Sequence, residues 1–204
     1  MINLDSIKRN SNLKKFLIWL ITTDRHPRPR IWVRYLLTPF WFEKGKKSII
    51  RRRCRLDVFP WHKFSMGDHS IIESFSTINN GSGDVVLGEK VRIGIGSVVI
   101  GPVTFGNRVG LGQHVFICGF NHIYADGEKD SNEQGLSKKP IVIQEDSHIG
   151  ANSVIVAGVH IGKRCQIGAG SVVTKDIPDF SIAVGNPAKV IKQYNHQTKL
   201  WEKV

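Results

Sequence analysis

A six-residue period constrains this chain more than any other feature of its sequence. From Leu87 onward an apolar residue recurs at every sixth position, and after one interruption the spacing resumes at Ile143. The positions are Leu87, Ile93, Val99, Phe105, Leu111, Ile117, Ile143, Ile149, Ile155, Ile161, Ile167 and Val173. In a chain that is 41% apolar, this agreement has a chance probability on the order of 10⁻⁵. The period fits neither an α-helix nor an ordinary strand, and it predicts a repeat architecture.

The residues around each apolar position predict how one repeat folds. Glycine follows in seven units, where a missing Cβ suits a tight corner: Gly88, Gly94, Gly106, Gly112, Gly150, Gly162 and Gly168. Four residues after the apolar position stands a small or β-branched residue, such as Ser97 or Ser153. We expect three units to close one triangular coil, with strands of stacked coils pairing in parallel about 4.8 Å apart. An earlier coil is readable at Met66, Ile72 and Ile78, so the repeat covers about residues 66–178.

One long interruption of the period predicts a functional loop. The segment between Ile117 and Ile143 is polar and has no apolar period, so residues 118–142 should leave the coil as a loop. Loops on rigid scaffolds tend to carry function. His122 lies at the root of this loop, and histidine is the side chain whose pKa suits proton removal near neutral pH.

Several motifs resemble one known family. They are residues 118–122 (CGFNH), 139–143 (KPIVI), 149–151 (IGA), 168–178 (GAGSVVTKDIP) and 185–192 (GNPAKVIK). Over about residues 66–192 the chain resembles the hexapeptide-repeat acyltransferases, which include galactoside, colanic-acid-type and virginiamycin-type O-acetyltransferases. The resemblance implies an all-β, left-handed parallel β-helix and a homotrimer whose three sites lie in grooves between neighbouring subunits. It also implies that His122 is the general base.

The same resemblance assigns roles to further residues. The backbone N–H of Ala151 would donate to the oxyanion of the tetrahedral intermediate. Acetyl-CoA would contact the backbone at Ala151, Ala169 and Thr174, while its phosphates would meet Lys175, Lys189 and Lys192. His148 stands where the family usually has a tryptophan and is expected to form a channel wall.

A short polar insertion in the repeat provides candidate residues for binding the acceptor sugar. Asn79, Asn80 and Asp84 lie where the repeat shifts phase, and we expect them to contact the sugar. Asp126 or Glu145 would orient the His122 imidazole.

Positive charge is concentrated in the first third of the chain. The net charge is +12, and residues 1–63 carry sixteen Lys and Arg against four Asp and Glu. This segment also holds Trp19, Trp32, Trp41 and Trp61, four of the five tryptophans. We interpret residues 1–63 as a basic helical arm, with helices at 11–22 and 31–37, that is attracted to anionic lipid. A packing arm is the alternative, and no nucleic-acid-binding motif accompanies the charge.

The remaining boundaries and the compartment follow from local signals. The β-helix should span residues 64–178, and residues 179–204 should form a C-terminal cap with a helix that begins at Asn186 and Pro187. Three cysteines without metal-type spacing predict a reducing cytoplasm and no required metal. The apolar run at residues 16–21 is far shorter than the roughly 20 residues of a membrane-spanning helix. We therefore expect a cytoplasmic protein, which the basic arm would bring into contact with the inner face of the membrane.

The resemblance thus implies a CoA-dependent O-acetyltransferase that acts on a sugar hydroxyl in surface polysaccharide synthesis. Three alternatives stay open. Transfer to the amine of a nucleotide sugar needs the same fold and cofactor. A zinc-dependent carbonic anhydrase of this fold would need three converging histidines, with His114, His122 and His148 as candidates. A non-catalytic scaffold would leave His122 without a role.

Overall fold

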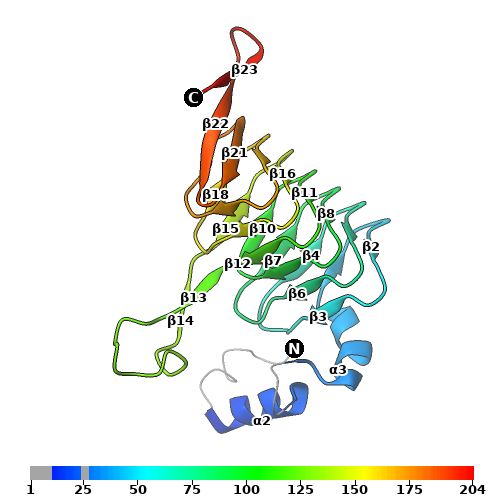
Figure 1. Cartoon of the computed structure of the whole chain (residues 1–204). Helices are drawn as coiled ribbons and strands as arrows, with labels where there is room; N and C mark the ends of the chain where they lie inside the picture. The colour runs from blue at the N-terminus through cyan, green and yellow to red at the C-terminus, as the bar shows by residue number, and fades with distance from the viewer. Residues whose placement is uncertain (1–10, 24–27) are drawn as a thin grey trace.

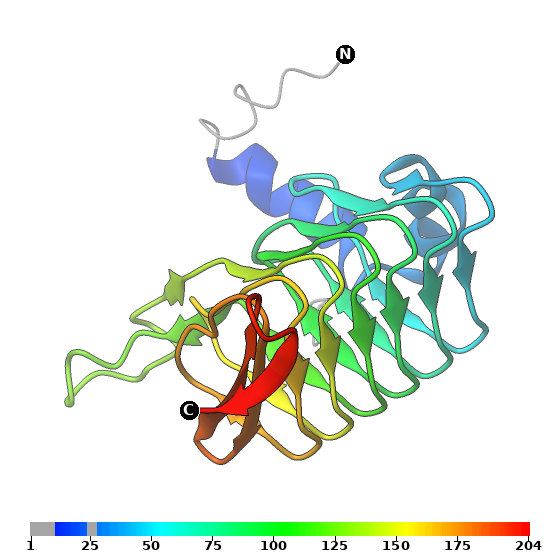
Figure 2. The ribbon, with the colours of Figure 1, turned by 90° about the horizontal axis from the view of Figure 1, so that it is seen from above.

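Six stacked coils form the body of the protein. The computed structural model describes residues 11–23 and 28–204 (Figure 1). Each coil contributes one short strand to each of three parallel sheets, so the coils build a three-sided prism (Figures 1 and 2). The predicted β-helix is confirmed.

Each sheet contains one strand from every coil, and sheet C is extended by C-terminal strands that pair antiparallel. Sheet B contains β1 (Glu43–Lys44), β4 (Phe64–Met66), β7 (Val85–Leu87), β10 (Val103–Phe105), β15 (Ile141–Ile143) and β18 (His160–Ile161). Sheet C contains β2 (Ile49–Ile50), β5 (Ile71–Ile72), β8 (Arg92–Ile93), β11 (Gly110–Leu111), β16 (His148–Ile149), β19 (Gln166–Ile167), β21 (Ser181–Gly185), β22 (Ala188–Asn195) and β23 (Leu200–Lys203). Sheet D contains β3 (Arg55–Asp57), β6 (Thr77–Asn79), β9 (Val98–Ile100), β12 (Phe116–Cys118), β17 (Val154–Ile155) and β20 (Val172–Val173).

The periodic apolar residues fill the interior of the prism. All twelve are buried, and each stacks on its counterpart one coil away. Ile149, for example, lies between Leu111 and Ile167 in the register of sheet C. Burial of a side chain of this size contributes roughly 1.5–3 kcal/mol, so the ladder of aliphatic residues supplies most of the stability.

Buried serines join successive coils. The Ser147 hydroxyl donates to the Gly162 carbonyl at 2.7 Å and accepts the Cys165 N–H at 2.9 Å. Ser97 makes the matching pair of bonds with Gly112 and Val115. Where a serine stands four positions after the apolar residue, as at Ser97 and Ser147, its hydroxyl satisfies backbone groups of the next coil.

Close stacking at the corners explains the glycines of the repeat. A Cβ on Gly150 would lie 2.4 Å from the Ala169 nitrogen of the next coil, and one on Gly94 would lie 2.1 Å from the Gly112 oxygen. These glycines were predicted to suit a tight corner; the structure shows that the next coil leaves no room for a Cβ.

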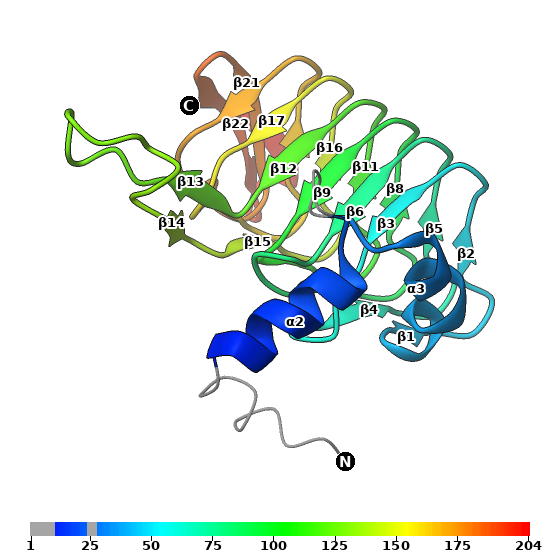
Figure 3. The same ribbon diagram turned by 90° about the horizontal axis from the view of Figure 1, so that it is seen from below.

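The first coil begins earlier than predicted. Strands β1–β3 lie inside residues 1–63, the segment predicted as a helical arm, and pair in parallel with β4–β6. The arm proper is formed by α2 (Ser11–Ile21), α3 (Ile31–Leu36) and the 3₁₀ turn η1 (Thr38–Phe40). Residues 1–10 and 24–27 of the predicted arm lie outside the described residues. Helix α3 lies beside the first coil (Figure 3), where the Arg34 guanidinium donates to the Cys54 carbonyl at 2.6 Å.

The predicted C-terminal helix is wrong. Residues 188–195 form strand β22, which pairs antiparallel with β21 and carries β23 on its other side. Strand β21 stands at the last coil of sheet C and offers an open edge for pairing. Ala188 and Val190 pack against the core at the alternating spacing of a strand. Pairing with that edge outweighs the local helix-start signal at Asn186 and Pro187.

Loss of one buried serine should measurably weaken the stack. Ser147→Ala leaves the Gly162 carbonyl and the Cys165 N–H without their partner, so we expect a loss of about 2 kcal/mol in the free energy of unfolding. Chemical denaturation at fixed protein concentration measures the loss. Ser131→Ala, in the exposed loop, is the control and should change stability by less than about 0.5 kcal/mol. Equal stabilities of the two variants would contradict this account of the coil contacts.

Candidate active site

The predicted base is carried by a hairpin that leaves the prism at one edge. His122 ends β13 (Phe120–His122), which pairs antiparallel with β14 (Leu136–Lys138), and His122 lies opposite Leu136. The loop projects sideways between the fourth and fifth coils (Figures 1 and 2). The imidazole is exposed, and the Phe120 ring meets it edge-on at 6.0 Å between centroids. The predicted loop at 118–142 is thus a hairpin with an irregular tip.

Backbone bonds fix the root of this hairpin to the coils. The Lys139 N–H donates to the Gly119 carbonyl at 2.9 Å, and the Gly158 N–H donates to the Lys139 carbonyl at 3.0 Å. His122 therefore extends from a rigid anchor at the edge between sheets D and B.

Ala151 and Ala169 lie on a different edge, between sheets C and D. They occupy the same corner of successive coils, and the Gly170 N–H donates to the Ala151 carbonyl at 2.8 Å. Within the described part of the chain, the N–H groups of Ala151 and Ala169 have no hydrogen-bond acceptor. Unpaired N–H groups at a corner can stabilise an oxyanion or a polar substrate atom.

The predicted phosphate ligands lie toward the C-terminal end of the stack. Thr174 and Lys175 are exposed and follow β20, the last strand of sheet D. Among the described residues nothing accepts the Thr174 N–H, because no further coil covers that strand edge. Lys189 and Lys192 are carried by β22, and Lys192 lies opposite Ile182 of β21. The donor set, unpaired N–H groups with lysines, suits the carbonyls and phosphates of coenzyme A.

One chain does not bring the predicted base and the predicted oxyanion donor to the same edge. His122 extends from the edge between sheets D and B, whereas Ala151 lies at the edge between sheets C and D. Sheet D separates them. A site that contains both must combine two copies of the chain.

The predicted acceptor residues have structural roles. Asn80 is fully buried, and its amide binds the backbone of Phe59 and His62. Its assignment to the sugar is therefore wrong. Asn79 accepts the Gly81 N–H at 2.7 Å, and Asp84 accepts the Lys63 N–H at 2.8 Å. These bonds shape the turn that shifts the repeat phase.

The two carboxylates that were expected to orient His122 pair with lysines instead. Asp126 lies 3.1 Å from the Lys129 ammonium, and Glu145 lies 2.9 Å from the Lys163 ammonium. These lysines lower the pKa of both carboxyl groups. No described residue forms a hydrogen bond with the His122 imidazole.

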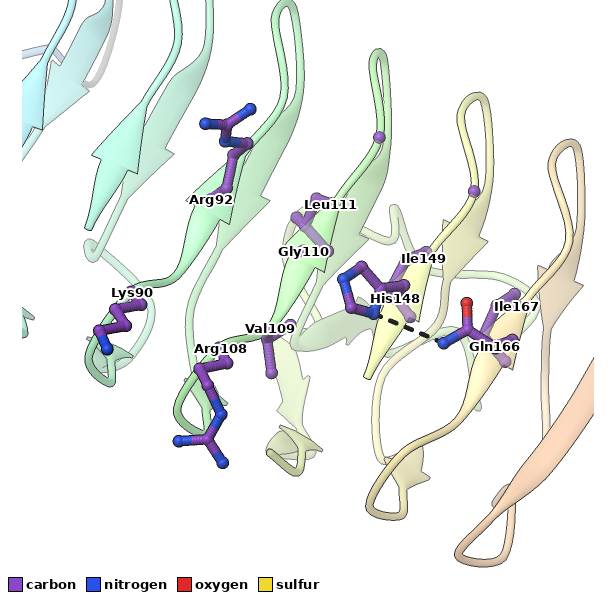
Figure 4. A pocket seen from close by; sticks show the side chains of 12 residues that line it. Lys90, Arg92, Arg108, Val109, Gly110, Leu111, His148, Ile149, Gln166 and Ile167 are labelled. Carbon is purple, nitrogen blue, oxygen red and sulfur yellow. Dashed lines mark hydrogen bonds between the residues drawn. The ribbon is translucent and has the colours of Figure 1, made fainter. Parts of the chain in front are cut away.

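A groove on the outer face of sheet C was missed in the sequence. It encloses about 550 Å³, and Lys90, Arg92, Arg108, Gly110, His148 and Gln166 line it together with neighbouring apolar residues (Figure 4). Gly150, which precedes Ala151, also lines the groove. His148, which was expected to form a channel wall, lies on β16 and lines this groove. The signal that was overlooked is Gly110, a glycine at a position where the repeat otherwise places an outward side chain.

The histidines proposed for a zinc site lie in different places. His114 occupies a corner beside Gly96, His148 lies on sheet C, and His122 lies on the hairpin. Among the residues that the structure describes, no three His, Cys, Asp or Glu side chains are grouped so that they could hold a metal ion.

Sequence comparisons relate the chain to transferases. Residues 140–175 match the family model "Bacterial transferase hexapeptide (six repeats)". The chain is 31% identical over 170 residues to WbbJ of Escherichia coli, a protein named for O-acetyl transfer in lipopolysaccharide biosynthesis, and the match covers 76% of this chain and 87% of WbbJ. A Mycobacterium tuberculosis protein named as an acetyltransferase is 36% identical over 129 residues, which cover 62% of this chain. The match spans only 42% of that longer relative.

A structural comparison agrees on the fold. AntD of Bacillus cereus, an N-acyltransferase solved with dTDP and coenzyme A, superposes with a TM-score of 0.66 at 20% identity. The superposition covers 79% of this chain and 89% of AntD.

Acid should remove the stabilising effect of Asp146. The Arg108 guanidinium lies 2.5 and 2.9 Å from its two oxygens and holds the pKa of that carboxyl below its usual value. The contribution is therefore present above the unfolded-state pKa, about 3.9, and is lost as the pH falls through the lower folded-state pKa. Asp146→Asn should cost no more than about 1 kcal/mol at neutral pH. The melting temperatures of the wild-type chain and of Asp146→Asn, measured between pH 3 and 8, should converge in acid. A difference between the two proteins that stays constant with pH would refute this role of Asp146.

Proposed function

Because this chain belongs to the hexapeptide-repeat acetyltransferases, we propose that it transfers the acetyl group of acetyl-CoA to a hydroxyl of a sugar, with His122 as general base. The observation that carries the proposal is His122, exposed on a rigidly anchored hairpin next to a prism edge. The sugar hydroxyl as acceptor is supported by the likeness to WbbJ, which is named for lipopolysaccharide biosynthesis. AntD, which is an N-acyltransferase also solved with dTDP-4-amino-4,6-dideoxyglucose, supports the alternative, transfer to an amino sugar.

The chemistry divides between two sets of groups. A bound thioester supplies an activated acyl carbon. His122 removes the proton of the attacking hydroxyl and can return it to the leaving thiolate. The Ala151 N–H, which is unpaired among the described residues, stabilises the oxyanion as the carbonyl becomes tetrahedral. Lys175, Lys189 and Lys192 attract the phosphates of the cofactor.

A homotrimer would complete this site. In the third to sixth coils the outward residues of sheet D are apolar and aligned: Val98, Phe116, Val154 and Val172 face out in register, and Phe116 is 42% exposed. Three prisms that turn sheet D toward a common axis place the sheet D–B edge of one copy beside the sheet C–D edge of the next. His122 of one copy would then approach Ala151 of its neighbour.

The helical arm is proposed to hold the enzyme at an anionic membrane. Large apolar side chains are exposed along α2, α3 and η1: Phe16, Ile18, Trp19, Leu20, Ile31, Trp32, Tyr35, Leu36 and Phe40. Cationic residues, including Lys15 and Arg34, accompany them. Apolar groups flanked by cations favour the interface of anionic lipid. No helix within the described residues is long and apolar enough to cross a bilayer. A cytoplasmic enzyme so placed would meet lipid-linked glycans.

Removal of the base should abolish turnover without unfolding the protein. We expect His122→Ala to lower kcat for thiol release from acetyl-CoA, measured with a panel of sugars, nucleotide sugars and amino sugars, by about 10²–10⁴-fold. Tyr124→Ala, a change at an exposed residue of the same loop, controls for disturbance of the loop. Full activity of His122→Ala would refute the mechanism, and turnover with amino sugars alone would select the alternative acceptor.

Mixed trimers can test whether the site is shared. His122→Ala and Ala151→Pro should each be inactive, since one removes the base and the other removes the N–H. When the two variants are co-expressed, each mixed trimer contains one intact pair, so about a quarter of wild-type activity should return. The single variants must retain the wild-type melting temperature for the comparison to hold. No recovery of activity in verified mixed trimers would contradict the shared site.

Salt-sensitive flotation with liposomes can test the membrane proposal. The wild-type chain should float with phosphatidylglycerol vesicles at low salt, because the cations and exposed rings act together. Phe16→Ser combined with Trp19→Ser should reduce flotation severalfold, whereas Tyr124→Ser, which alters an exposed ring outside the arm, should not. Equal flotation of all three proteins, or none, would refute the proposal.

A further inference from the structure

Sheet C carries a hollow that is built by a missing side chain. The outward residues of four successive strands, Arg92, Gly110, His148 and Gln166, lie in register across β8, β11, β16 and β19. Gly110 presents no side chain, so the groove opens between Arg92 and His148 (Figure 4). A Cβ at this position would lie 2.9 Å from the His148 Cδ2 atom. Any larger residue would therefore fill the hollow.

Two cations of the groove have no acidic partner. Arg108 is neutralised by Asp146, which also lies 3.7 Å from Arg164. Lys90 and Arg92, in contrast, form no ion pair with any carboxylate of the described residues. No Asp or Glu is among the described residues that line the groove. The groove thus keeps a net positive charge that a ligand can neutralise.

His148 adds a directed polar atom. The Gln166 amide lies 3.5 Å from the His148 Nδ1 atom (Figure 4), and the opposite ring edge, with Nε2, overhangs Gly110. When Gln166 donates to Nδ1, the imidazole proton resides on Nε2 and points toward the hollow. The groove lining then offers three donors: the Lys90 ammonium, the Arg92 guanidinium and the His148 Nε2–H.

We propose that the hollow over Gly110 binds an oxyanion, a phosphate or carboxylate, that is part of the acetyl acceptor. The guanidinium of Arg92 suits two oxygens of such a group at once. This inference rests on the proposed function, because Gly150 lines the groove and the next residue, Ala151, carries the oxyanion-stabilising N–H. The acceptor is thereby an anionic sugar, and its charged group is held beside the reacting carbon.

The phosphates of coenzyme A have other ligands in this chain. Lys175, Lys189 and Lys192 all lie beyond the last strands of the six coils, after β20 and on β22. The groove instead spans β8 to β19. Its cations are therefore assigned to the second substrate.

Calorimetric titration of the full chain can test this site. Glucose 1-phosphate and glucuronate probe the phosphate and carboxylate versions, and glucose is the neutral reference. We expect at least one anionic sugar to bind more tightly than glucose, and the tighter of the two identifies the anionic group. Arg92→Gln should weaken that binding about tenfold. Gly110→Val should weaken it as strongly, because it fills the hollow and keeps every charge. Lys44→Gln removes an exposed cation from β1 and should leave Kd within twofold.

Three results would overturn the inference. The first is that neither anionic sugar binds more tightly than glucose. The second is that Gly110→Val retains full binding of the anionic sugar. The third is that Lys44→Gln weakens this binding as much as Arg92→Gln, which would indicate diffuse charge attraction. A fourth result would assign the hollow to the cofactor and would also overturn the inference. In that case Arg92→Gln weakens the binding of CoA about tenfold and leaves the binding of dephospho-CoA unchanged. Failure of the proposed function would appear in a different measurement, the turnover of acetyl-CoA. A wild-type chain without this turnover can still bind the anionic sugar.

Discussion

The constant register between successive coils is the constraint on which the rest of the structure depends. The N–H groups of one coil donate to carbonyls of the next, as from Gly112 to Ile149 and from Gly150 to Ile167, at 2.8 and 2.7 Å. Each coil must therefore have the same perimeter, and extra residues can leave only at a corner. The hairpin with His122 departs between β12 and β15 for this reason. A regular stack thus both presents the hairpin and anchors it.

The same register gives each side of the prism its own chemistry. The residue just before each periodic apolar position points outward, and every third unit returns to the same sheet. In the third to sixth coils these residues are Val98, Phe116, Val154 and Val172 on sheet D, whereas on sheet C they are Arg92, Gly110, His148 and Gln166. A single position in six therefore distinguishes an apolar face from a polar groove. The inward ladder is the same on both.

The sequence predicted the coils well where a coil has another coil stacked on each side of it. At the first coil one of the three periodic positions is polar: Lys44 pairs with Met66 and is exposed, because no coil lies beneath it, whereas Ile50 and Leu56 are apolar and pack against the core. The period is thus broken at a position where its physical cause, burial between two coils, is lost. The C-terminal error has a related origin: the open edge of β21 recruits β22 by long-range pairing, which local helix signals at Asn186 and Pro187 cannot reveal. His122 was found because a loop interrupts the period, whereas the groove was missed because Gly110 does not disturb it.

Height along the prism also connects the hairpin with the groove. His122 follows β12 of the fourth coil, Ala151 follows β16 of the fifth, and the groove over Gly110 spans the third to the sixth. In the proposed trimer the three-fold axis runs along the stack, so corresponding coils of neighbouring copies lie at equal height. A base on the fourth coil of one copy then differs by one strand spacing, about 4.8 Å, from the Ala151 N–H of the next. A side chain on a projecting hairpin can span that offset, so the interruption after the fourth coil brings a base close to the level of the Ala151 N–H.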